Sequence, residues 1–275
     1  MSYKTLLVHL DDSRHSDARL EFALGLAVAY DAHLIGLYVV CQEMTRPMFI
    51  HGENFLLAVA EAQATARETR AHDHFIEAAQ RAGCRYEWRA PDESPVDAVT
   101  LNARHADLLI FGQYDSADPS SYIAQHFLDD LLMSCGRPAI VLPATGQPST
   151  FADNVVIAWD GSREAARALS DALPLLRAAS FVTVVEVPRH PRHAETEGID
   201  ISAYLERHGI RASFLALPRT SRQNEGTALL SHLNTLHADL LVMGAFGHTR
   251  AHERILGGVT RTMLESMTTP VLMSH

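Results

Sequence analysis

Lysine is almost absent from this chain, because Lys4 is the one lysine among 275 residues and every other strongly basic side chain is an arginine. A Walker A loop, a protein kinase and a Schiff-base enzyme each need a lysine in a defined sequence setting. The residues around Lys4 match none of these settings. The scarcity of lysine therefore excludes three large classes of enzyme chemistry.

Cysteine and net positive charge are scarce as well. Cys41, Cys84 and Cys135 are widely spaced and form no CxxC pair, so we expect buried, inert thiols rather than disulfides or a metal site. The formal net charge of −10 argues against a nucleic-acid partner, because that affinity comes largely from basic side chains. It leaves open a small phosphate ligand held by backbone N–H groups.

Long apolar runs are missing too. None approaches the roughly 20 residues that span a bilayer, so the sequence predicts no transmembrane segment. The first residues lack a basic region and a small-residue cleavage site, and we expect a cytoplasmic protein. Histidine pairs such as His190 with His193 and His248 with His252 have no evident third ligand, so no metal site is expected.

The chain does contain an internal repeat. HADLLIFG begins at His105, and HADLLVMG begins at His237, 132 positions later (237 − 105). The starts of the two halves also match, because LLVHLDDSR from Leu6 resembles VVIAWDGSR from Val155. The segment ATGQPST, at 144–150, has the composition of a linker. Two domains are therefore predicted, at 1–146 and 147–275.

Within each half, short runs of Val, Ile and Leu alternate with longer stretches that have helical spacing. Continuous apolar strands indicate a parallel sheet that is buried on both faces. The predicted fold class is α/β, with two tandem, doubly wound domains that each have a five-stranded parallel sheet. In the second half we expect strands at 154–159, 181–187, 211–217, 239–244 and 270–274, and helices at 163–179, 201–208, 222–237 and 259–267.

The first half should be similar, with a longer second helix at 61–81 and extra residues at 41–55. These extra residues contain methionine and phenylalanine. They could form a lid, a partner surface or a cover for apolar surface between the domains.

The loop after the fourth strand of the second half carries the clearest chemical signal. In such sheets, ligands bind beyond the carboxyl ends of the strands. The sequence GAFGHTRAHERILGGVTRTML combines glycines, which let backbone N–H groups approach an anion, with basic side chains and a helix start. Asp160 closes the first strand, where it could bind a ribose or an adenine edge. The alternative is that the glycines form turns and that Asp160 caps a helix.

The spacing of Gly244, Gly247 and Gly257 resembles the ATP-binding signature of the universal stress protein family, and Asp160 matches that family's aspartate after the first strand. The resemblance covers essentially the whole chain and implies a Rossmann-like fold of the adenine nucleotide α-hydrolase type. It also implies that ATP, with magnesium, binds in the C-terminal domain. The implied site residues are Asp160, Val187, Gly244, Gly247, His248, Arg250, Gly257, Gly258, Val259 and Thr260.

One position departs from the family signature, because Gly258 stands where the family has Ser or Thr. A glycine keeps the N–H group but lacks the hydroxyl, which is worth about 1 kcal/mol if hydrogen-bonded. Thr260 could supply this hydroxyl instead.

The first half departs much further. Its loop keeps a counterpart of the first glycine, Gly112, but has Asp115, Gln125 and His126 at the next three glycine positions. Side chains at these positions would obstruct the backbone, and an aspartate would repel a polyphosphate. Asp11 remains after the first strand, where it is compatible with a helix N-cap. We expect no nucleotide in this domain, and instead a structural role, a regulatory role or another ligand.

Three functional hypotheses follow. The preferred one is an ATP-binding stress-response protein that acts through nucleotide-dependent binding or assembly, with no catalytic residue. The second is a slow ATPase or phosphotransferase that uses His248, His252 or Glu253. The third is a scaffold that binds no nucleotide. The resemblance also implies pairing of the two domains through their last strands. A homodimer and an unknown protein partner are compatible with the sequence. Nucleic acid and membrane partners are not expected.

Overall fold

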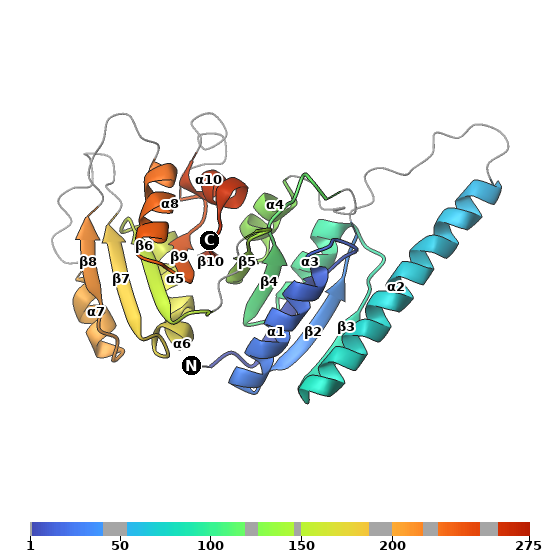
Figure 1. The fold of residues 1–275 in the computed structure, drawn as a ribbon, viewed down its shortest axis with the longest axis horizontal. Coiled ribbons are helices and arrows are strands. Elements are labelled where there is room, and N and C mark those ends of the chain that lie inside the picture. Colours follow the sequence, from blue (N-terminus) through green and yellow to red (C-terminus); the bar gives the residue numbers. More distant parts are fainter. Residues whose placement is uncertain are drawn as a thin grey trace. The chain divides into compact units, whose positions relative to one another are not determined.

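The computed structural model describes residues 2–40, 54–118, 126–145, 150–186, 200–216, 225–247 and 258–275. The chain divides into two compact units, Tyr3–Cys135 and Gly136–His275 (Figure 1). Within the described ranges, each repeat supplies five strands that alternate with helices. The predicted α/β fold class is therefore confirmed.

The first unit is built on a parallel sheet with the order β3-β2-β1-β4. Leu6, Leu7 and Val8 of the central strand are fully buried, as expected for a strand that is covered on both faces. The strands are β1 (Thr5–Leu10), β2 (His33–Tyr38), β3 (Arg85–Arg89) and β4 (Leu108–Gly112).

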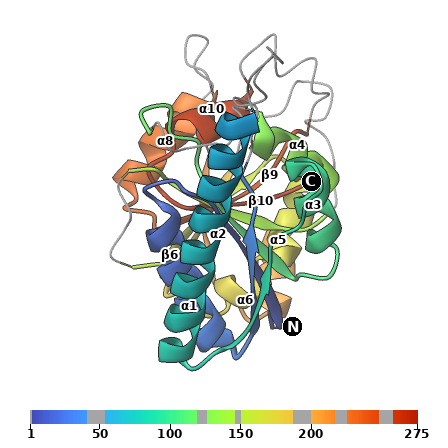
Figure 2. The ribbon, with the colours of Figure 1, turned by 90° about the vertical axis from the view of Figure 1, so that its right-hand side faces the viewer.

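Helices cover both faces of this sheet. Helix α1 (Ser16–Tyr30) packs with α2 (Asn54–Ala82) on one face, and α3 (Pro95–Ala103) packs with α4 (Phe127–Ser134) on the other (Figure 2). Helix α2 is longer than the helix predicted at 61–81, because it begins within the segment that the sequence marks as extra. The rest of that segment, at 41–53, lies outside the described residues.

The sheet of the second unit has the order β5-β10-β9-β6-β7-β8. Its neighbouring strands are parallel, except that β5 runs antiparallel to β10, with Val141 opposite Val271. The compact unit therefore begins at Gly136, ahead of the predicted sequence division at 146, because the last strand of the first repeat belongs to its sheet. The strands are β5 (Ala139–Leu142), β6 (Asn154–Trp159), β7 (Phe181–Glu186), β8 (Ser213–Ala216), β9 (Leu240–Gly244) and β10 (Val271–Ser274).

The prediction of a single helix at 163–179 is wrong. Two helices occupy this segment and meet at Ala172, because Pro174 has no N–H group to donate along a continuous helix. The helices of this unit are α5 (Arg163–Asp171), α6 (Leu173–Leu176), α7 (Ile201–Arg207), α8 (Glu225–Thr235) and α10 (Val259–Ser266). In the parts of the chain that the structure describes, no helix has the length and apolar character needed to cross a bilayer.

The repeated HADLL sequence has a structural role in both units. The carboxylate of Asp107 accepts hydrogen bonds from the backbone N–H groups of Lys4 (2.8 Å) and Thr5 (3.0 Å), which lie at the start of β1. Asp239 does the same for Asp153 (3.1 Å) and Asn154 (3.0 Å) at the start of β6. Each aspartate thus ties the start of the first strand of its repeat to the strand beside it.

The cysteines differ in their burial. Cys135 is buried, as predicted, whereas Cys84 is half-buried. Cys41 lies outside the described residues.

Candidate functional site

The turn after β9 is held by two hydrogen bonds that reach separate elements. Ala245 N donates to Ser274 O at the end of β10 (2.8 Å), and Phe246 N donates to Thr260 Oγ1 in the first turn of α10 (3.1 Å). Phe246 has a φ of 53°, a left-handed conformation that costs a non-glycine residue roughly 1–2 kcal/mol. The segment from Gly244 to Gly247 is therefore fixed directly against the start of α10.

Helix α10 begins where the sequence predicts. Gly258 is its N-cap residue and provides no side-chain hydrogen bond. Among the described residues, the N–H groups of Val259 and Thr260 have no hydrogen-bond partner. Thr260 is 2% exposed, and its hydroxyl oxygen already accepts from Phe246 N, so it stabilises the turn in addition to its predicted place in the site.

Gly244 is required by packing. A Cβ atom at this position would lie 2.6 Å from Ala165 N and 2.7 Å from the carbonyl carbon of Glu164, both backbone atoms in the first turn of α5. Backbone atoms cannot give way as a flexible side chain can. This glycine therefore lets α5 approach the end of β9 closely, whatever the loop binds.

Asp160 lies directly after β6, which is paired with β9, so the two strand ends are neighbours. Its Oδ1 accepts a hydrogen bond from Ser162 N (2.8 Å) across Gly161, whose φ is +73°. The N-cap of α5 is Ser162, whose hydroxyl accepts from Ala165 N (3.0 Å). The alternative that Asp160 caps this helix is therefore wrong.

A buried carboxylate beside this loop was missed by the sequence analysis. Glu164, in the first turn of α5, is 5% exposed, and its Oε2 would lie 3.7 Å from a Cβ atom at Gly247. Its Oε1 pairs with the guanidinium of Arg163, whose side chain is 83% exposed. The sequence offers little indication of this burial, because a glutamate in the first turn of a helix usually interacts favourably with the helix dipole while it stays exposed to solvent.

Part of the predicted site falls outside the ranges that the structure describes. Val187, His248, Arg250 and Gly257 lie outside the described residues, as do His252, Glu253 and the pair His190 and His193. The structure brings together Gly244, Gly247, Gly258, Val259 and Thr260, with Asp160 at the adjacent strand end.

In the corresponding loop of the first unit, Asp115 is held by contacts within the unit. Asp115 Oδ2 lies 3.0 Å from His15 Nε2 and also pairs with Arg14, while Asp115 Oδ1 accepts from Ala117 N (2.9 Å). Hydrogen bonds from His15, Ala117 and Arg14 hold the pKa of Asp115 at about 2. The charge of Asp115 is therefore compensated by Arg14 of the same unit.

Asp11 is also neutralised internally. Its Oδ1 accepts from Arg19 Nη2 (2.7 Å) and from the Ser13 hydroxyl (2.6 Å), and Arg19 Nε donates to His9 O (2.5 Å). Burial raises the pKa of Asp11, but Arg19, His9 and Ser13 together lower it to about 2. The N-cap of α1 is His15, so the interpretation of Asp11 as a cap is wrong.

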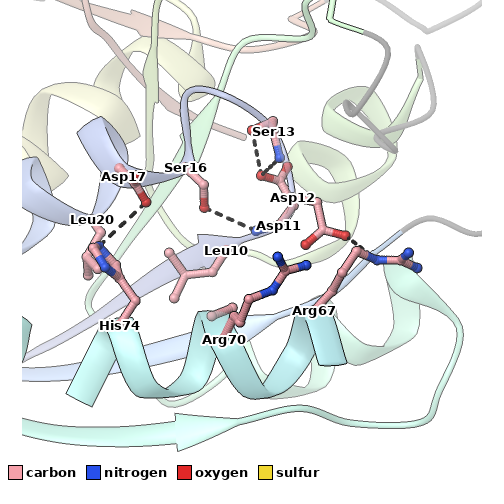
Figure 3. Close-up of a pocket in the computed structure, with 11 residues that line it drawn as sticks. Leu10, Asp11, Asp12, Ser13, Ser16, Asp17, Leu20, Arg67, Arg70 and His74 are labelled. Carbon is pink, nitrogen blue, oxygen red and sulfur yellow. Dashed lines mark hydrogen bonds and ion pairs between the residues drawn. The ribbon is translucent and has the colours of Figure 1, made fainter. Parts of the chain in front are cut away.

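A cleft of about 270 Å³ lies between the β1–α1 loop and α2 (Figure 3). Arg67 Nε is 2.8 Å from Asp12 Oδ2 in an ion pair, and His74 Nε2 is 3.5 Å from Asp17 Oδ1, so side-chain contacts cross the cleft at two places. Figure 3 shows Arg70 between these pairs on α2. Because its charges are largely matched by the protein itself, this cleft is a weaker candidate for a ligand site than the loop after β9.

Comparisons with known proteins agree with this architecture. The model of the universal stress protein family matches residues 2–142 and again 152–275. A universal stress protein from Archaeoglobus fulgidus DSM 4304 superposes with a TM-score of 0.74 at 16% identity, covering 98% of this chain and 97% of that chain. A protein of unknown function from Pseudomonas aeruginosa PAO1 does so with a TM-score of 0.57 at 15% identity, covering 99% and 92%.

Likeness at such low identity shows the fold alone, and no curated protein matches the chain in sequence. The family model nevertheless covers nearly the whole chain, in two consecutive copies. The chain therefore belongs to the universal stress protein family, as a tandem member with two family domains.

Proposed function

We propose that the second unit binds ATP with magnesium, or another adenine nucleotide, and that the chain acts in a stress response through nucleotide-dependent binding or assembly. The observation that carries this proposal is the hydrogen bond from Phe246 N to Thr260 Oγ1 (3.1 Å), which holds the glycine turn against the start of α10. Backbone N–H groups at a helix start are suited to phosphate oxygens.

The described residues fit a phosphate group in two respects. Gly247 has no side chain, and the N–H groups of Val259 and Thr260 have no partner within the described residues. Asp160, at the neighbouring strand end, is suited to accept from a ribose or an adenine edge. The first unit is proposed to bind no nucleotide, because Asp115 and Asp11 are already neutralised by its own cations.

The stress-response role, the cytoplasmic location, a homodimer and a protein partner expected from the sequence belong to this proposal as well. Nucleotide-dependent assembly would require that the bound phosphates change the conformation or surface of the loop after β9.

Isothermal titration of ATP with magnesium tests the proposal. Wild-type protein should bind about one ATP per chain. Gly247→Asp should abolish binding, because it copies Asp115 of the first unit and places a second carboxylate beside Glu164. Circular dichroism checks that the variant folds.

Gly25→Ala is the matched control, because a Cβ atom there meets nothing within 4 Å, and it should bind as the wild type does. Absence of binding by the wild-type protein, with or without magnesium, would contradict the proposal.

A further inference from the structure

The two repeats provide an internal comparison of what surrounds an anion at this site. Both Asp115 and Gly247 stand three residues after the last residue of a strand, β4 and β9 respectively. Asp11 and Asp160 likewise both follow the first strand of their repeat. Aligned in this way, Arg14, His15 and Asp115 correspond to Arg163, Glu164 and Gly247.

In the first unit, the carboxylate of Asp115 acts as a built-in anion at this position. It contacts the guanidinium of Arg14 and the ring of His15, whose Nε2 lies 3.0 Å away, and it accepts from Ala117 N at 2.9 Å. The side chains at positions 14 and 15 are therefore within contact distance of an anion held in this loop.

In the second unit, the side chains at the same three positions carry different charges. The position of the built-in anion is Gly247, and a Cβ atom there would be 3.7 Å from Glu164 Oε2. The arginine is kept as Arg163, but the histidine is replaced by the buried carboxylate of Glu164. An anion bound at Gly247 would therefore approach one exposed cation and one buried carboxylate.

We propose that Arg163 and Glu164 set the cation dependence of phosphate binding in the second unit. Arg163 contacts the phosphates, and Glu164 repels them unless a divalent cation neutralises the charge between the two anions. This inference rests on the proposed nucleotide function. Two like charges about 4 Å apart near a protein surface oppose each other strongly enough to change affinity by tenfold or more. Magnesium is commonly bound through one or two carboxylates together with phosphate oxygens.

The test compares ATP dissociation constants in EDTA and in magnesium for wild-type protein and three variants. Glu164→Gln keeps the size of the side chain and removes its charge. The ratio of the constant in EDTA to that in magnesium should fall by at least about tenfold, mainly through tighter binding in EDTA. Arg163→Gln should weaken binding in both buffers and raise this ratio. Glu206→Gln, at an exposed position of α7, should leave both constants unchanged.

Adenosine provides a second measurement, because it has no phosphate. Its affinity should be the same in the wild type and in Glu164→Gln, in either buffer. Wild-type binding of ATP with an unchanged ratio in Glu164→Gln would overturn this inference and leave the proposed function intact. Failure of the wild type to bind in both buffers would overturn the proposed function and this inference together.

If Glu164→Gln does not fold, the ratio of dissociation constants measured for Arg163→Gln tests the inference. An unchanged ratio in that variant also overturns the inference.

Discussion

The guanidinium of Arg19 lies 2.7 Å from the carboxylate of Asp11, and both side chains are at most 2% exposed. The counterpart of Arg19 in the second repeat is Ala168, so this buried counter-ion is specific to the first repeat. Arg19 also lies against Gly112, where any Cβ atom would overlap its guanidinium. The pair of Arg19 and Asp11 is therefore buried beside the ends of β1 and β4.

Arg19→Met should lower the free energy of unfolding of the first unit by about 3–5 kcal/mol, because it leaves the buried charge of Asp11 without its counter-ion. Urea unfolding followed by Trp88 fluorescence, in a Trp159→Phe background, reports on this unit. Arg85→Met is the control, since its ion pair with Asp31 is exposed, and it should change the free energy by less than about 1 kcal/mol. Equal effects of the two substitutions would refute a stabilising buried pair.

His9 should make the first unit less stable in mild acid. Burial lowers its pKa from 6.5 to about 4, an effect that Asp11 opposes and Arg19 reinforces. Because the folded pKa lies below the unfolded one, stabilisation is complete above pH 6.5 and is lost as the pH falls from 6.5 to about 4. The shift corresponds to about 3 kcal/mol. In urea unfolding, His9→Gln should lose about 3 kcal/mol less than the wild type between pH 7 and pH 4. Parallel profiles of the two proteins would exclude this role for His9.

Gly244→Ala should destabilise the second unit by about 1–3 kcal/mol, because its Cβ atom would meet the backbone of α5. Gly247→Ala is the matched control within the same turn. Its Cβ atom would make an ordinary contact of 3.7 Å with Glu164, so its stability should stay close to that of the wild type. Thermal unfolding followed by Trp159 fluorescence, in a Trp88→Phe background, separates the two. A stable Gly244→Ala protein would show that α5 can move away from β9.

Thr260→Val should cost about 1–3 kcal/mol, because it leaves the buried Phe246 N–H without an acceptor. Thr260→Ser keeps the hydroxyl and should retain most of the stability. Urea unfolding measures both variants, and titration with ATP shows whether the turn must be fixed for binding. If valine and serine have the same effect, the hydrogen bond contributes nothing measurable.

The strands could be predicted from the sequence because a strand buried on both faces needs a continuous apolar run. Strand β6 has the predicted bounds, and β9 and β10 differ by a single residue at their starts. The turn of Gly244 and Gly247 and the helix start at Gly258 were also found, since their positions follow from where the strands end.

The buried charges could not be predicted. Arg19 lies in a helix of Ala and Leu, where an arginine usually faces solvent, and its burial depends on a carboxylate eight positions earlier. Glu164 is buried because Gly244 lets α5 approach β9, a contact between segments far apart in the sequence. The break at Ala172 is different, because Pro174 is enough to predict it from the sequence.

The antiparallel pairing of β5 with β10 decides where this chain can be cut. A fragment that starts at residue 147 lacks β5. One edge of β10 then has unpaired backbone donors and acceptors, which can pair with a strand of another molecule, including β10 of another copy. A fragment that starts at Gly136 keeps the pairing of β5 with β10. The ten residues 136–145 therefore belong in any fragment of the second unit, because β5 within them occupies the edge of β10 that would otherwise be exposed.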